Sequence, residues 1–263
     1  MTMSIGMGSQ AAGERERFER ALAEVLTAAR DRDIRLRLLG ALAFHVRCPR
    51  YGYLQAALGR IYTDLDFAAY GADAKRIQQL FTDGLGYRAD EMVFVESEGA
   101  RMMFDHPGHG LHVDVFFDRL AFNHIISWRG RLEVDTPTIP LAELLLEKMQ
   151  IVQINKKDII DTVMLLLEHP LGETDAGTIN IKLIAHLCAE DWGLWRTVTM
   201  NLDKVKRLSA GFAQLDGTLQ TAVAAQADAA LARIAADPKP LRWRMRERIG
   251  DRVKWYRDVD AIK

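Results

Sequence analysis

The sequence predicts an α+β protein, in which a mixed sheet with flanking helices is followed by a C-terminal helical region. Short apolar runs separated by turn residues fill positions 34–117, a pattern typical of strands that alternate with helices. After Pro137, apolar residues recur at helical spacing as far as residue 236. We therefore expect two domains, an α/β domain over 1–135 and a helical domain over 136–263.

The first half is expected to interleave helices and strands. Phe18, Leu22 and Val25 recur at helical spacing, whereas Ile34, Leu36 and Leu38 alternate with basic residues as in a strand. Glycine, proline and serine mark two turns that indicate hairpins. The expected elements are helices over 14–32, 41–46 and 74–85, strands over 34–38, 64–70 and 111–117, and turns near 97–99 and 107–110.

The second half has a helical pattern without strand signals. Leucine, isoleucine and valine repeat every three or four residues, which favours amphipathic helices. The expected helices cover 140–152, 157–169, 179–188, 192–208 and 219–236.

Composition narrows the class of protein. The net charge of −1 gives no global basic field that would attract nucleic acid or a membrane surface. Cys48 and Cys188 are too few for a disulfide framework and lack metal-binding spacing. The first residues do not have the pattern of a signal peptide, and the longest apolar runs are too short to span a bilayer. We expect a cytoplasmic protein without a membrane partner.

Acidic residues on two predicted strands indicate a metal site. Asp64 and Asp66 are two positions apart, so they point to the same face of a strand while Leu65 and Phe67 face the core. Asp114 lies on the later strand. Adjacent carboxylates repel each other unless a cation or a proton lies between them, and Mg²⁺ prefers oxygen ligands. Together with Gly40 at the end of an earlier strand, the three carboxylates favour nucleotidyl transfer over a solvated strand edge.

Four segments in this order resemble the nucleotidyltransferase superfamily, and most closely the abortive-infection (AbiE) toxin nucleotidyltransferases. The segments are LLGALAF at 38–44, GRIYTDLDF at 59–67, HVDVFFDRL at 112–120, and the pair PLAELLLEKMQ at 140–150 and KKDIIDTVMLLLEH at 156–169. The resemblance covers about residues 35–170 and implies a nucleotidyltransferase-like mixed sheet.

The resemblance implies a role for each matching position. Asp64, Asp66 and Asp114 correspond to the carboxylates that hold Mg²⁺ or Mn²⁺, and so are the expected catalytic and metal residues. The positions expected to bind the nucleotide are Gly40, Ala41, Lys148, Lys157 and Asp158. The implied substrate is an NTP, whose NMP would pass to an acceptor hydroxyl on a small molecule, a tRNA end or a protein.

Two departures from the family support a different function. The family has Gly-Gly or Gly-Ser where this chain has Gly40-Ala41, and the chain between Gly40 and Asp64 is longer than usual. The alternative is therefore a non-catalytic member of the same fold that binds a nucleotide or a partner protein. Lys148 falls within an apolar helical stripe, so it must meet either a phosphate or a carboxylate such as that of Asp161.

Two further clusters have a functional and a structural interpretation. His106, His109 and His112 could hold zinc, but the Pro-Gly turn between them favours an exposed hairpin. The basic and aromatic stretch 239–263 could contact RNA, or it could be the solvated face of a helix.

Overall fold

The computed structural model describes residues 4–259, and the chain forms two compact units. The first unit is the chain up to His45 together with Gly59–Leu120 and Ser127–Ile139. The second is Val46–Leu58, Ala121–Ile126 and the chain from Pro140 onward. The units therefore do not follow a single cut in the sequence. The sequence predicts two domains that meet between residues 135 and 136. Whether these two parts fold independently stays a prediction.

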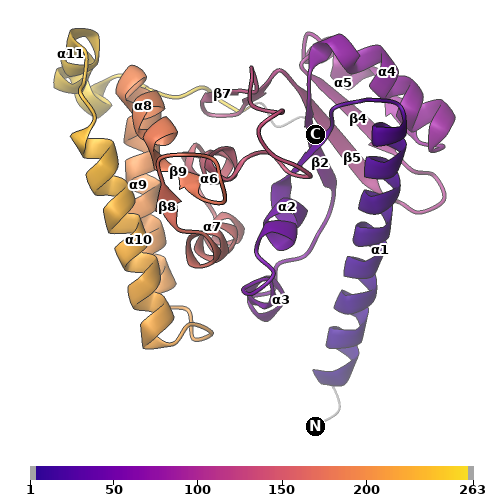
Figure 1. The fold of residues 1–263 in the computed structure, drawn as a ribbon, viewed down its shortest axis with the longest axis horizontal. Helices are drawn as coiled ribbons and strands as arrows, with labels where there is room; N and C mark the ends of the chain where they lie inside the picture. Colours follow the sequence, from indigo (N-terminus) through magenta and orange to yellow (C-terminus); the bar gives the residue numbers. More distant parts are fainter. Residues whose placement is uncertain (1–3, 260–263) are drawn as a thin grey trace. The chain divides into compact units, whose positions relative to one another are not determined.

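The first unit combines short strands with helices, as Figure 1 shows. Helix α1 carries the apolar repeat of Phe18, Leu22 and Val25, and all three side chains are buried. Its helices are α1 (Ser4–Asp31), α2 (Gly40–Arg47), α4 (Ala74–Gln79), which continues as a π-helical turn over Leu80–Gly84, and α5 (Glu91–Glu96). Its main strands are β1 (Arg37–Leu39), β2 (Leu65–Ala69), β3 (Arg88–Asp90), β4 (Arg101–Asp105) and β5 (His112–Phe117).

These five strands form one mixed sheet in the order β1-β2-β5-β4-β3 within the described residues. Strand β2 is antiparallel to β1 and parallel to β5, and β5 is antiparallel to β4. The mixed sheet and its helices confirm the α+β class. The register aligns Leu39, Asp66, Asp114 and Met103 in one row across four strands.

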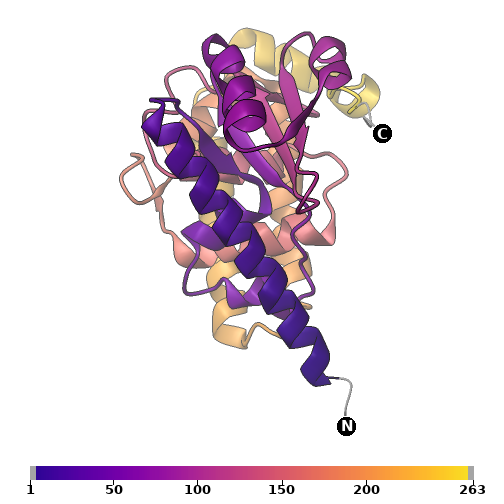
Figure 2. The same cartoon turned by 90° about the vertical axis from the view of Figure 1, so that its right-hand side faces the viewer.

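The two faces of the sheet differ in chemistry because successive side chains on a strand point to opposite sides. One face presents Leu65, Phe67, Val113, Val115 and Phe104, which are fully buried. Figure 2 shows α1 in front of the sheet. The row that contains Asp66 and Asp114 belongs to the opposite face, and this face is the polar one.

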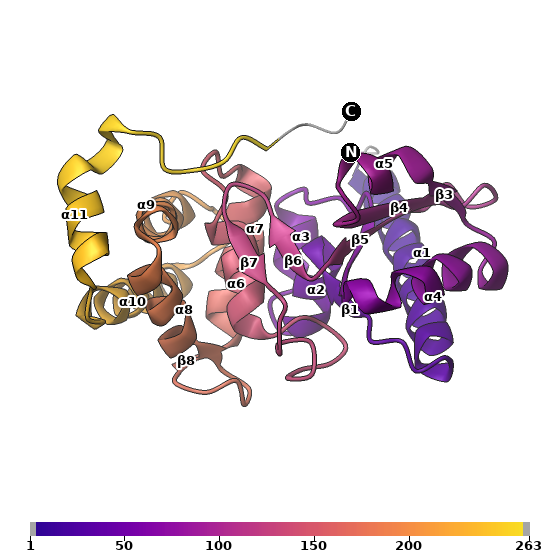
Figure 3. The same cartoon turned by 90° about the horizontal axis from the view of Figure 1, so that it is seen from above.

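The described part of the second unit is mainly helical. Figure 3 shows α8, α9 and α10 of this unit, with α11 beside α9. The elements are α3 (Tyr53–Ala57), α6 (Leu141–Met149), α7 (Lys156–Glu168), β8 (Leu171–Gly172), β9 (Ile179–Asn180), α8 (Ile181–Glu190), α9 (Trp192–Ser209), α10 (Gly217–Ala236) and α11 (Leu241–Ile249). The strands β6 (Arg119–Ala121) and β7 (Ile125–Ser127) lie where the chain passes between the units.

Most predicted elements are present, but two predictions are incomplete. The strand predicted over 34–38 covers only part of that range, because β1 is Arg37–Leu39. The turn predicted near 97–99 does precede β4, but the chain before it forms the helix α5 instead of a simple hairpin strand. Asp90 begins this helix because its carboxylate accepts hydrogen bonds from the backbone N–H of Met92 and Val93. The second predicted turn, at 107–110, does connect the antiparallel strands β4 and β5. Within residues 4–259, no helix is long and apolar enough to span a membrane.

Candidate functional site

The candidate site lies on the polar face of the sheet in the first unit. Asp66 on β2 and Asp114 on β5 are direct partners in the register of these parallel strands, so both side chains lie on this face. Neighbouring strands are about 4.8 Å apart, which brings two carboxylates together. Asp64 lies immediately before β2, two positions from Asp66. The sheet therefore places Asp66 and Asp114 on adjacent strands of one face.

Gly40 lies against Asp66 where β1 ends and α2 begins. Its φ of +74° lies in the left-handed region that favours glycine. A Cβ at this position would overlap Oδ2 of Asp66 and would lie 3.0 Å from its Cγ. The next residue, Ala41, is buried in the first turn of α2. Both the backbone angle and the space therefore require glycine at residue 40.

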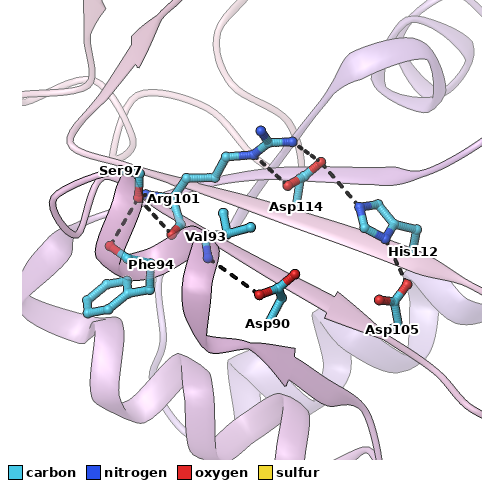
Figure 4. A network of polar contacts seen from close by, with 8 residues as sticks. All are labelled: Asp90, Val93, Phe94, Ser97, Arg101, Asp105, His112 and Asp114. Atoms are coloured by element: carbon cyan, nitrogen blue, oxygen red, sulfur yellow. Dashed lines mark hydrogen bonds and ion pairs between the residues drawn. The ribbon is translucent and has the colours of Figure 1, made fainter. Parts of the chain in front are cut away.

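Asp114 is held by two cationic side chains, as Figure 4 shows. Arg101 on β4 donates from Nε to Oδ1 and from Nη2 to Oδ2, each over 2.8 Å. His112 places its Nε2 3.6 Å from Oδ2 of Asp114 and its Nδ1 2.8 Å from Oδ1 of Asp105. The carboxylate of Asp114 therefore already has charged partners within its own sheet.

The electrostatics of this group favour charged forms throughout. The carboxylate of Asp114 raises the pKa of His112 to about 9, against the opposing effect of burial, and the hydrogen bond with Asp105 adds to the rise. Burial alone would raise the pKa of Asp114, but the ion pair with His112 and the hydrogen bonds from Arg101 outweigh it and lower this pKa below its usual range. Asp114 is therefore a carboxylate and His112 an imidazolium at neutral pH.

The fit of a divalent ion differs between the carboxylates. Asp64 and Asp66 offer oxygen atoms two positions apart, which suits a hard cation such as Mg²⁺. Asp114 gives both of its oxygens to Arg101, so as it lies it does not fit as a third ligand. Across residues 4–259, no group of three or more His, Cys, Asp or Glu side chains is arranged to hold a metal ion. That one cation meets all three carboxylates stays a prediction.

The predicted residues of the later segments belong to the second unit. Lys148 is buried on α6, and its Nζ lies 2.6 Å from Glu147, 3.7 Å from Asp161 and 4.0 Å from Asp158. Gln55 also donates to Oδ1 of Asp161 over 3.0 Å. Burial opposes the charge of Lys148, but the carboxylates of Glu147, Asp161 and Asp158 outweigh it and raise its pKa. Of the two kinds of partner that the sequence left open for Lys148, the structure shows the carboxylate.

Asp158 also shapes the start of α7. Asn155 and Asp158 form a capping box, in which each side chain accepts a hydrogen bond from the backbone N–H of the other. Lys157 is exposed beside them. The roles of Lys148, Lys157 and Asp158 in nucleotide binding stay predictions.

The histidines near the second turn have structural partners. His106 Nδ1 accepts hydrogen bonds from the backbone N–H of Gly108 and His109, and the rings of His106 and His109 stack 4.3 Å apart. His112 instead faces Asp105 and Asp114. This arrangement is the turn that the sequence favoured over a zinc site.

Asp118 occupies the turn that follows β5. Its φ is +60°, and its Oδ1 accepts a hydrogen bond from the backbone N–H of Gly71 over 3.1 Å. Its role is to fix this turn.

Arg101 is the site residue that the sequence did not reveal. It alternates with Met103 and Asp105 along β4, so its face could be inferred, but its partner depends on the register between β4 and β5. No protein-family model, curated protein or solved structure matches this chain. The fold and site therefore define an α+β protein with a mixed sheet and a charged cluster on one face.

Proposed function

We propose that the protein is a metal-dependent nucleotidyltransferase that moves NMP from an NTP to an acceptor hydroxyl. The observation that carries this proposal is the row in which Asp66 and Asp114 are register partners on adjacent strands, with Gly40 packed against Asp66. Gly40 leaves room for the Asp66 carboxylate beside the first turn of α2, where backbone N–H groups favour anions. The likeness of four segments to the toxin nucleotidyltransferases supports the same function.

Asp64 and Asp66 would hold the ion, and Mg²⁺ or Mn²⁺ is the expected cofactor. When bound, such an ion supplies the charge that stabilises the attacking and leaving oxygens of an in-line displacement. The acceptor hydroxyl belongs to a small molecule, a tRNA end or a protein side chain, and the nucleotide contacts of the first unit would come from Gly40 and Ala41.

The ion pair of Arg101 with Asp114 favours a second candidate function. A carboxylate whose oxygens both accept from one guanidinium has less capacity for a metal. The second candidate is a non-catalytic member of the fold that binds a nucleotide or a partner protein.

Incubation with α-labelled NTPs and Mg²⁺ tests the first function. Candidate acceptors are tRNA, total protein and small hydroxyl compounds, and the readout is label that becomes covalently attached to an acceptor. Asp66→Asn should reduce transfer to background because it removes a metal ligand. Asp203→Asn, at an exposed position of α9, is the matched control and should keep full activity. Binding of NTP without transfer to any acceptor would instead support the non-catalytic candidate.

A further inference from the structure

The polar face of the sheet holds an arginine in a fixed orientation. The guanidinium of Arg101 makes two parallel hydrogen bonds to Asp114 and lies over the ring of Phe116, with Cζ 5.3 Å from the ring centroid. Its backbone N–H donates to Oγ of Ser97 over 3.0 Å, which fixes the start of β4. An arginine whose backbone and guanidinium are both held loses little further conformational freedom when it binds a ligand.

This arginine still has hydrogen-bond donors to offer. A guanidinium carries five N–H groups, and the two bonds to Asp114 use two of them. Figure 4 shows the third nitrogen turned away from Asp114. The side chain of Arg101 remains 22% exposed, whereas that of Asp114 is 6% exposed. The buried partner is therefore the carboxylate, and the accessible group is the cation.

Stability alone explains this pair poorly. Removing a carboxylate from water costs free energy, and a buried ion pair is commonly no more stabilising than apolar residues of similar volume. The opposite face of this sheet shows that apolar packing is available in the fold. Arginine is the residue that suits planar, bidentate recognition of phosphate.

We infer that Asp114 positions Arg101 as a binding group for the polyphosphate of the substrate. This inference rests on the proposed function for its choice of ligand. Asp66, one strand away from Asp114, would contribute to the metal site, while Arg101 supplies positive charge where a third carboxylate ligand would otherwise hold metal. Asp114 is then a positioning residue.

Metal-free binding separates Arg101 from the metal site. Inorganic tripolyphosphate is titrated into the full chain by calorimetry, first in EDTA and then with Mg²⁺. In EDTA, Arg101→Gln should weaken binding by at least about tenfold because charge-assisted hydrogen bonds are lost. Arg101→Lys keeps the positive charge but cannot make two parallel hydrogen bonds. Its affinity for tripolyphosphate should therefore lie between those of the unaltered chain and Arg101→Gln. Arg88→Gln, an exposed arginine on β3 of the same sheet, is the matched control and should bind like the unaltered chain.

The response to Mg²⁺ assigns the carboxylates. Added Mg²⁺ should tighten binding to the unaltered chain and to Asp114→Asn, but not to Asp66→Asn. Loss of this response in Asp114→Asn would make Asp114 a metal ligand and overturn the inference. No binding to the unaltered chain in EDTA would overturn it too, as would equal binding by Arg101→Gln. Melting curves show whether each variant is folded. If Arg101→Gln does not fold, Arg101→Lys still tests the inference.

The two proposals fail in different ways. Arg101-dependent binding of tripolyphosphate without nucleotidyl transfer would keep the inference and remove the proposed function. Transfer that survives Arg101→Gln with unchanged kcat and KM would keep the proposed function and remove the inference.

Discussion

Gly40 and Asp66 occupy adjoining space so closely that residue 40 has no room for a side chain. A Cβ built on Gly40 would overlap Oδ2 of Asp66, and the φ of +74° at residue 40 is rare for any other residue. The end of β1 and the acidic residue of β2 are thus fitted to each other. A side chain added at residue 40 must therefore displace the carboxylate of Asp66.

We predict that Gly40→Ala lowers the free energy of unfolding by more than the cost of its left-handed backbone conformation alone. A non-glycine residue in the left-handed region costs about 1–2 kcal/mol, and the clash with Asp66 adds to this. Urea denaturation measures the decrease in the free energy of unfolding. Gly59→Ala is the matched control, because Gly59 has a φ of +76° and nothing within 4 Å of its added Cβ.

The double variant Gly40→Ala with Asp66→Ala identifies the source of the extra loss. Shortening Asp66 removes the atoms that the new methyl group would meet, so the double variant should lose less than the sum of its parts. Additive losses would show that the contact is not the cause.

The part of the site that follows from strand alternation could be predicted, and the part that follows from register could not. His112, Asp114 and Phe116 alternate with buried Val113 and Val115, so the sequence indicates that Asp114 lies off the core face. Arg101, however, is 13 residues from Asp114, and their contact depends on how the turn at 106–111 aligns β4 with β5. No local pattern sets that alignment.

Helix α5 shows the same limit on a local scale. Its six residues are too few for a periodic signal, and the turn residues at 97–99 dominate the pattern. Only Asp90, a residue that commonly begins helices, marks its start. The partners of Lys148 were easier to predict because Asp158 and Asp161 are three positions apart on one helix face.

We predict that Lys148→Met destabilises the protein by about 3–5 kcal/mol, since it leaves the fully buried Asp161 beside other carboxylates without the cation. Chemical denaturation gives the magnitude. Lys157→Met, at an exposed position of the neighbouring helix, should change stability by less than about 0.5 kcal/mol. Similar losses in the two variants would contradict the assignment of Lys148 as the partner of the buried carboxylates.

His124 should make stability depend on pH. It is buried in the second unit, where its Nε2 lies 2.8 Å from Oγ1 of Thr197, and burial lowers its pKa. The unfolded chain therefore takes up a proton at about pH 6.5 while the folded chain does not. The contribution of His124 to the free energy of unfolding is full above this pH and declines below it, by up to about 1.4 kcal/mol per pH unit.

Denaturation curves between neutral and mildly acidic pH test this dependence. His124→Gln should flatten the acidic decline relative to the unaltered chain. His186→Gln, at an exposed position of α8, tests whether loss of any histidine has the same effect. Parallel curves for the His124 variant and the unaltered chain would exclude His124 as the source.

The basic stretch 239–263 contains arginines that bind other parts of the protein and arginines that are exposed. Only the exposed ones can be replaced to test for an RNA acceptor. Arg242 pairs with Glu190, and Arg246 donates to the backbone carbonyls of Gly250 and Val253. Trp243 is buried and donates to the carbonyl of Cys188. Removing residues 239–263 would therefore damage the second unit, and a loss of binding would say little about RNA.

Arg244 and Arg248 are the better probes, because both are exposed on α11. If tRNA is the acceptor, replacing both with Gln should weaken tRNA binding without lowering NTP binding. The slope of log affinity against log salt should fall by about 1–2, since each phosphate contact releases counterions. The control is Lys182→Gln with Arg207→Gln, two exposed cations elsewhere in this unit. Equal tRNA affinity and equal slopes for both variants would reject RNA guidance by α11, and a small molecule or a protein would then be the acceptor to pursue.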